Sequence, residues 1–197
     1  MNPRAEKIFN GIAPIYRLFF NFQVKYYQKI LTEAEARFSP LQYKTVVDVG
    51  CGTGALCYVL NSFGMDVTGV DQAAKMLAIA DKKLQDTPTK LILASALEPI
   101  PLPDKNFDVA ISSYTIHGMK KEERKQMYRE MARLAKYLVI FHDYNEKRSL
   151  VSDILETLEG GNYFDFISNP KGEMEEYFQE VHVLPVGSKA AWYVCIP

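Results

Sequence analysis

A glycine-dense turn between an apolar run and a helical pattern constrains this chain more than any other feature. Residues 46–56 read Val-Val-Asp-Val-Gly-Cys-Gly-Thr-Gly-Ala-Leu. The apolar run contains an acid, Asp48, directly before the turn, and the turn carries Gly50, Gly52 and Gly54. Glycine allows sharp backbone turns and lets main-chain atoms approach a ligand closely. The pattern predicts a strand–turn–helix unit that binds a ligand at the carboxyl end of a first parallel strand.

A second acid closes the next apolar run. Gly69-Val70-Asp71 ends that run about twenty residues after the turn, the separation typical of an acid that binds a ribose. Gly50, Gly52 and Ala55 also satisfy the glycine pattern of dinucleotide-binding proteins. Taken alone, this pattern fits a nicotinamide cofactor as well as other adenosine-containing ligands.

The position of Asp48 favours one of these ligands. A bound pyrophosphate would lie near this carboxylate, and like charges roughly 4 Å apart at a partly buried site cost on the order of 4 kcal/mol. S-adenosylmethionine carries an ammonium and a sulfonium and no phosphate, so the same carboxylate attracts it. Its ribose diol suits Asp71, whose two oxygens can each accept one hydroxyl hydrogen bond. A nicotinamide-dependent oxidoreductase and a purely structural turn remain the alternatives.

Composition narrows the class of protein. The 197 residues favour a single domain, and a hydrophobic share of 48% is enough for a core. The net charge of -1 gives no general attraction to nucleic acid. We expect no membrane span, because no apolar stretch approaches about 20 residues. The polar N-terminus and the three unpaired cysteines favour a reduced, cytoplasmic protein, and the three dispersed histidines give no metal-ligand spacing.

Hydrophobic periodicity predicts alternating strands and helices, and hence an open, mostly parallel sheet with helices on both faces. An N-terminal helical region, residues 4–38, is expected to break or kink at Pro14. Later in the chain, helical structure is expected to be interrupted at Gly160-Gly161 and at Asn169-Pro170. The predicted strands are 45–49, 66–71, 90–94, 107–113, 137–141, 181–186 and 190–196, and the predicted helices between them are 54–63, 73–84 and 122–135.

Four segments give the chain a resemblance to a known family: residues 47–54, 69–77, 98–108 and 112–117. On these motifs the sequence resembles the class I S-adenosylmethionine-dependent methyltransferases. Within that group it is similar to the type 11 small-molecule branch, which includes ubiquinone and menaquinone biosynthesis methyltransferases. The resemblance covers residues 5–142 and, more loosely, the final hairpin. It implies a Rossmann-like seven-stranded sheet with a C-terminal antiparallel hairpin, in one domain whose residues 1–40 form a helical cap over the site.

The resemblance also implies which residues bind the cofactor, S-adenosylmethionine. The glycine turn would hold the methionine end, Asp71 the ribose, and the segment after the third strand the adenine. Where the family often has an acid in that segment, this chain has Ala94-Ser95-Ala96-Leu97, so the Ser95 hydroxyl or the backbone would contact the adenine. The implied set is Tyr16, Asp48, Gly50, Cys51, Gly52, Thr53, Gly54, Asp71, Gln72, Met76, Ser95, Ala96, Leu97 and Ser112.

Methyl transfer from a sulfonium is an in-line displacement that depends mainly on positioning. A general base is needed only if the acceptor must lose a proton early. His117 is the first candidate, because imidazole titrates near working pH, and His142 is the second. Tyr114 would place an electron-rich ring beside the sulfonium. A solvated loop histidine is the alternative for His117.

The sequence therefore predicts a methyltransferase that acts on a small-molecule acceptor, without metal, nucleic acid or membrane, as a monomer or homodimer. A catalytically silent module that binds the cofactor remains a further alternative.

Overall fold

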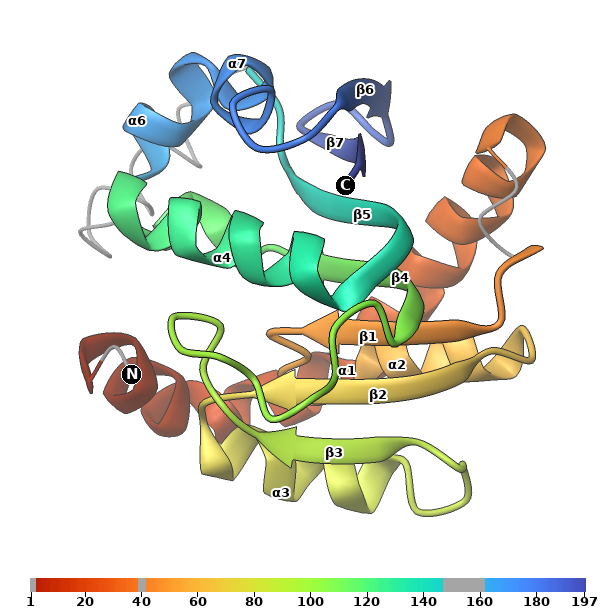
Figure 1. Ribbon diagram of the computed structural model, residues 1–197. Coiled ribbons are helices and arrows are strands. Elements are labelled where there is room, and N and C mark those ends of the chain that lie inside the picture. Colours follow the sequence, from red (N-terminus) through yellow and green to blue (C-terminus); the bar gives the residue numbers. More distant parts are fainter. Residues whose placement is uncertain (1–2, 39–41, 147–161) are drawn as a thin grey trace. The chain divides into compact units, whose positions relative to one another are not determined.

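The computed structural model describes residues 3–38, 42–146 and 162–197, with side chains at all of these positions except 3–9, 12, 14–16 and 36–38. The chain divides into two compact units, Met1–Leu102 and Pro103–Pro197. The first unit contributes three strands to the seven-stranded sheet, and the second contributes four (Figure 1). The prediction of a single domain with an N-terminal cap stays a prediction.

The first unit is a parallel βαβαβ arrangement. Strands β1 (Thr45–Val49), β2 (Asp66–Asp71) and β3 (Lys90–Leu93) lie in the order β3-β2-β1. Helices α2 (Ala55–Ser62) and α3 (Ala74–Lys83) connect them. Because Asp48 is in register with Gly69, the ends of β1 and β2 bring the glycine turn and Asp71 to the same edge. The bounds of β1 and β2 are those that the sequence predicts.

Helix α1 (Pro3–Phe38) runs unbroken through Pro14, so the expected pair of separate helices is not found. A proline inside a helix lacks the N–H group that would donate a backbone hydrogen bond. The packing of α1 against both α2 and α3 offsets this loss. Its buried side chains recur at spacings of three, four and seven residues, as on one face of a helix. Among the described side chains these are Ala13, Phe20, Tyr27, Ile30, Leu31 and Ala34.

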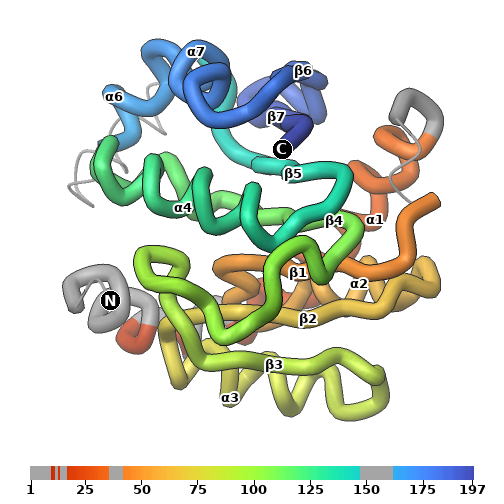
Figure 2. The backbone as a smooth tube through the Cα atoms, viewed as in Figure 1, coloured from red at the N-terminus to blue at the C-terminus, as the bar shows by residue number. Residues whose placement is uncertain are grey.

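The second unit combines parallel and antiparallel strands, in the order β4-β5-β7-β6 (Figure 2). Strands β4 (Phe107–Ser113) and β5 (Ala135–Tyr144) are parallel, whereas β7 (Ala190–Ile196) is antiparallel to both β5 and β6 (Glu180–Pro185). Helix α4 (Lys121–Leu134) packs on β4 and β5. Strand β5 is longer than the predicted 137–141, and this extension places the His142-Asp143 pair inside the strand.

Three short helices complete the second unit: η2 (Ile116–Gly118), α6 (Tyr163–Ser168) and α7 (Pro170–Met174). The predicted break at Asn169-Pro170 is confirmed, because Asn169 caps α7 by accepting from Gly172 N at 3.1 Å. The predicted break at Gly160-Gly161 lies outside the described residues.

The predicted fold class is confirmed: a mostly parallel seven-stranded sheet with an antiparallel C-terminal hairpin. Within the part of the chain that is described, no helix has the length and apolar character that crossing a membrane requires.

Candidate functional site

The glycine turn folds over the end of β2. Gly50 N and Cys51 N both donate to Val70 O, at 2.7 and 3.0 Å. Gly50, Gly52 and Gly54 have φ angles of 81°, 55° and 82°. This left-handed conformation is accessible to glycine at little cost and strained for other residues. The three glycines therefore build a turn whose path ordinary residues would oppose.

Gly52 and Gly54 serve different purposes in this turn. A Cβ atom on Gly52 would meet no atom within 4 Å, so its outer side is open. A Cβ atom on Gly54 would lie 2.7 Å from Leu84 Cδ1, so this glycine is required by packing against the end of α3. Gly54 also occupies the N-cap of α2. Gly52 is consequently the turn glycine that leaves room for a ligand. Packing alone explains the glycine at position 54, and no ligand is needed to explain it.

Asp71 links the turn to the helix that follows it. One carboxylate oxygen, Oδ2, accepts from Gly52 N at 2.8 Å, and Oδ1 accepts from Ala73 N at 2.8 Å. Burial raises the pKa of Asp71, and the N–H donors of Ala73 and Gly52 oppose that rise. Since each carboxylate oxygen has two lone pairs, both can still accept a hydroxyl hydrogen bond. The carboxylate is thus held in one orientation before any ligand arrives.

Asp48 is almost fully buried beneath the turn. Its Oδ2 accepts from Cys57 Sγ at 3.2 Å, while Oδ1 has no hydrogen-bond partner among the described residues. Desolvation, and more weakly the charge of Asp71, raise the pKa of Asp48 to about 7. A buried oxygen without a donor is costly. A cation held beside Oδ1 would relieve this cost and favour the charged carboxylate.

The other predicted cofactor residues of the first unit differ in their contacts. The Oε1 atom of Gln72 is buried and has no hydrogen-bond partner among the residues that the structure describes. Ser95 Oγ accepts from Leu97 N at 3.3 Å and so closes the turn that follows β3, with Ala96 half-buried in it.

Met76 packs with Ala13 and Ala73, so helix packing alone accounts for its burial. Cys51 and Thr53 are buried in the turn. The side chain of Tyr16 lies outside the described residues.

The second unit gathers the predicted catalytic residues at the end of β4. Tyr114 has a φ of 50°, unusual for an aromatic residue, and its N–H donates to His142 O at 2.8 Å. Its ring centroid lies 4.8 Å from that of His142 and 5.5 Å from that of Tyr144. Backbone strain of this kind concentrates at functional sites. Ser112 is buried there, and its Oγ has no partner within the described part of the chain.

The two candidate bases lie in different surroundings. His117 Nδ1 lies 2.7 Å from Asp143 Oδ1, and the side chain of His117 is 13% exposed. His142 is 1% exposed, and its Nδ1 lies 3.2 Å from Ser113 Oγ. Burial lowers the pKa of His142 to about 4, so it stays neutral at working pH. His117 is thus partly exposed beside a buried acid, whereas His142 is buried and neutral.

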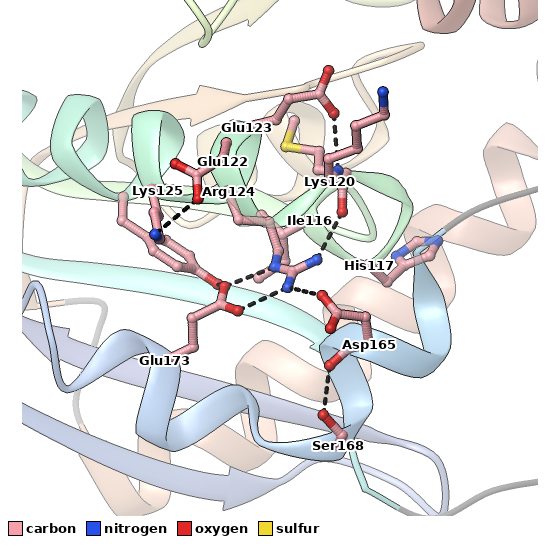
Figure 3. A network of polar contacts seen from close by, with 12 residues as sticks. Ile116, His117, Lys120, Glu122, Glu123, Arg124, Lys125, Asp165, Ser168 and Glu173 are labelled. Atoms are coloured by element: carbon pink, nitrogen blue, oxygen red, sulfur yellow. Dashed lines mark hydrogen bonds and ion pairs between the residues drawn. The ribbon is translucent and has the colours of Figure 1, made fainter.

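A buried arginine is the feature that the sequence analysis missed (Figure 3). The fully buried Arg124 of α4 donates from Nε and Nη2 to both oxygens of Glu173, at 2.7 Å each. It also donates to Asp165 Oδ2 at 2.6 Å and to Met119 O at 2.7 Å. The helical spacing could have indicated it, because Arg124 shares a face with the inward Met127 and Met131. The network joins α4 to α6, α7 and the residue that follows η2.

Comparisons with known proteins indicate the class of protein. Residues 47–140 match the family described as a methyltransferase domain. Demethylmenaquinone methyltransferase of Thermotoga maritima is 27% identical over 139 residues, which cover 67% of this chain and 57% of that protein. The chain spans roughly half the length of curated relatives that it matches.

Solved structures show the same fold. A putative S-adenosyl-L-methionine-dependent methyltransferase from Methanococcus maripaludis has a TM-score of 0.73 at 17% identity, covering 95% of this chain and 92% of that one. Phospholethanolamine N-methyltransferase 2 of Haemonchus contortus, solved with S-adenosylhomocysteine, has a TM-score of 0.59 at 18% identity, covering 72% and 34%.

These matches give no support to the nicotinamide-dependent alternative. Among the described residues, no cluster suited to a metal ion is present. Residues 47–140 thus match a methyltransferase domain, and the chain has the fold of S-adenosylmethionine-dependent methyltransferases.

Proposed function

We propose that this protein transfers the methyl group of S-adenosylmethionine to a small-molecule acceptor by direct in-line displacement. The observation that carries the proposal is the pair of acids at the ends of β1 and β2. Asp71 is oriented by two backbone N–H groups, and Asp48 presents a buried oxygen without a donor. Such a pair suits a ligand with a ribose diol at one end and an ammonium at the other.

The residues present fit this cofactor. Asp71 would accept the ribose hydroxyls, and the open side of Gly52 would admit the methionine end against bare backbone. Asp48 Oδ1 would face the ammonium, and the unpartnered Oε1 of Gln72 would accept from a ligand donor. The Ser95 hydroxyl would serve the adenine. When bound, the cofactor supplies an activated methyl group, so the protein contributes mainly orientation and exclusion of water.

The small-molecule acceptor is supported by a cluster of aromatic rings in the second unit and by the names of two similar proteins. Tyr114, His117 and Tyr144 form a cluster of rings at the ends of β4 and β5. The Thermotoga maritima relative is named for demethylmenaquinone, and the Haemonchus contortus protein was solved with phosphomonomethylethanolamine. From these two proteins we take only that the acceptor is a small molecule.

A labelled-methyl assay tests the proposal. The protein is incubated with S-adenosylmethionine labelled in its methyl group and with a panel of small metabolites, beside the Asp71→Ala variant. We expect label in a small product with the native protein and a large loss of label with the variant. Binding of S-adenosylhomocysteine without any methylated product across the panel would instead identify a silent cofactor-binding module.

A further inference from the structure

Two of the three cysteines lie side by side beneath the glycine turn of the first unit. Cys51 is part of the turn, and Cys57 lies in the first turn of α2, which packs on β2. A Cβ atom on residue 69 would stand 3.0 Å from Cys51 Sγ and 3.1 Å from Cys57 Sγ. Both sulfurs thus occupy the space that Gly69 leaves open by having no side chain, and the two thiols share a hydrogen bond.

The surroundings of the two sulfurs give them different chemical roles. Cys51 is 8% exposed and Cys57 is fully buried, so a small reagent reaches Cys51 first. Cys57 Sγ donates to Asp48 Oδ2 at 3.2 Å. Cys51 is therefore the sulfur that meets an incoming reagent, and Cys57 is the sulfur that has a carboxylate beside it to take its proton.

We propose that Cys51 and Cys57 form an oxidative modification site, at which a peroxide of the size of hydrogen peroxide joins the two sulfurs in a disulfide bond. We further infer that this disulfide and bound S-adenosylmethionine exclude each other. Formation of the bond does not depend on the proposed function, whereas its effect on the cofactor rests on that function.

The reaction balances with the peroxide as the oxidant. The Cys51 thiolate attacks one peroxide oxygen, so that an S–O bond forms, the O–O bond breaks, and the departing hydroxide takes up a proton as water. The sulfur of Cys57 then attacks the sulfenic acid of Cys51, so that an S–S bond forms and the S–O bond breaks. Asp48 accepts the thiol proton of Cys57 and passes it to the departing hydroxide. Two thiols are oxidised to one disulfide, and one peroxide is reduced to two waters.

Burial determines which oxidants react and how fast. Because Cys57 is fully buried and Cys51 nearly so, a bulky disulfide such as oxidised glutathione cannot approach either sulfur. The hydrogen bond between the thiols lowers the pKa of Cys51 and raises that of Cys57, and burial raises the pKa of both, so the net change is upward at each. Few thiolates form at neutral pH, so we expect slow oxidation that accelerates as pH rises.

The disulfide would alter the cofactor site at two places. Bonded sulfurs lie about 2.0 Å apart, closer than two thiols in contact, so the bond draws Cys51 toward α2. The next residue, Gly52, donates its N–H to Asp71 Oδ2 at 2.8 Å, and this contact moves with the turn. The bond also removes the thiol proton that Cys57 donates to Asp48 Oδ2.

Loss of that donor changes the charge of Asp48. Its Oδ1 already has no partner within the described part of the chain, so the oxidised protein leaves both oxygens of this buried acid without a protein donor. A buried acid without donors keeps its proton, and a neutral acid does not attract an ammonium group. A ligand that binds only the reduced form in turn opposes oxidation by mass action.

A thiol count tests the modification site. The native protein is treated with hydrogen peroxide, denatured and alkylated, and peptide mass spectrometry identifies the linked residues. We expect the free thiols to fall from three to one, with Cys51 joined to Cys57, and dithiothreitol to restore all three. Cys195, which lies on β7 and packs on Met174, is the internal control that stays free.

Three outcomes of this count would overturn the modification site. They are three free thiols after treatment, a disulfide that includes Cys195, and a sulfinic acid at Cys51 beside a free Cys57. The variant Cys57→Ser should form no disulfide, since its hydroxyl can donate to Asp48 but cannot join a sulfur. Cys195→Ser is the matched variant, and it should form the disulfide as the native protein does.

Calorimetry with S-adenosylhomocysteine tests the exclusion. We expect reduced Cys57→Ser to bind as the reduced native protein does, which shows that the variant folds. For the native protein and Cys195→Ser, we expect affinity to fall about tenfold or more once the disulfide has formed, and dithiothreitol to restore it. Saturating S-adenosylhomocysteine should slow disulfide formation in both.

The results separate this inference from the proposed function. Unchanged affinity in protein that contains the disulfide would overturn the exclusion. Absence of S-adenosylhomocysteine binding by the reduced native protein would refute the proposed function, whereas the thiol count would still decide whether the modification site exists.

Discussion

At the scale of single residues, we expect cofactor affinity to depend most on Asp71. In Asp71→Ala the ribose diol loses its acceptor, and Gly52 N and Ala73 N lose theirs as well. We expect the free energy of S-adenosylhomocysteine binding to weaken by about 1–3 kcal/mol, measured by calorimetry. Asp66→Ala is the matched control, because this exposed acid starts the same strand. Unchanged affinity in Asp71→Ala would remove Asp71 from the site.

Asp48 predicts a pH dependence of stability. Its pKa is about 7 in the folded protein against a usual 3.8, so between these values the folded state holds a proton that the unfolded chain has released. Stability conferred by this group is therefore greatest at low pH and falls as pH rises from about 4 to about 7, by on the order of 4 kcal/mol.

Urea denaturation at pH 5 and pH 8 measures this effect. The Asp48→Asn variant should lose much less stability than the native protein between these two pH values. The comparison cancels other groups, such as His142, that change equally in both proteins. Parallel pH profiles for the two proteins would contradict the account.

Sequence reasoning succeeded for residues whose role is local and failed for those whose role is set by distant partners. The contacts of Asp48 and Gly52 could be predicted because both residues lie in or beside the turn motif, and Asp71 could be predicted because it ends the next apolar run. Arg124 lies in the predicted helix 122–135, but its partner Glu173 is 49 positions away, so no local pattern indicates that they pair. The separation of 26 residues likewise hid the pairing of His117 with Asp143.

At the scale of elements, hydrophobic periodicity fixed the strand positions closely, because each strand carries a short apolar run bounded by turn residues. It failed where packing overrides local preference. Helix α1 passes through Pro14 because two helices support it, and β5 extends through polar His142 and Asp143 because β4 and β7 pair with it.

The turn itself supplies a prediction with a close control. Gly52 and Gly64 both have left-handed φ angles, 55° and 83°, and open space where a Cβ would stand. Valine at either position should cost roughly 1–2 kcal/mol of stability from backbone strain. Only Gly52→Val should abolish binding of S-adenosylhomocysteine, since Gly64 lies in the turn between α2 and β2, away from the glycine turn. Equal affinities in the two variants, measured by calorimetry, would count against the open face of Gly52.

The hydrogen bonds of Arg124 connect α4 with α6 and α7, so we expect their loss to lower the stability of the protein. Arg124→Met leaves Glu173, which is 9% exposed, without its charge partner, and should lower the free energy of unfolding by about 3–5 kcal/mol. Lys125→Met, one position along α4, should change the free energy of unfolding far less, because its partner Glu122 is exposed and solvent screens the pair. Chemical denaturation of both variants measures the difference. Similar losses would show that the buried network adds nothing specific.

At the scale of the whole molecule, the methyltransferase domain and the fold class could be predicted from four motifs, and the comparisons confirm both. The methyl acceptor could not be predicted, because no motif of the sequence identifies it. The most direct test of the central claim is calorimetric titration of the native protein with S-adenosylhomocysteine and, separately, with NADH. The account predicts heat of binding with S-adenosylhomocysteine and none with NADH; binding of NADH alone would contradict it.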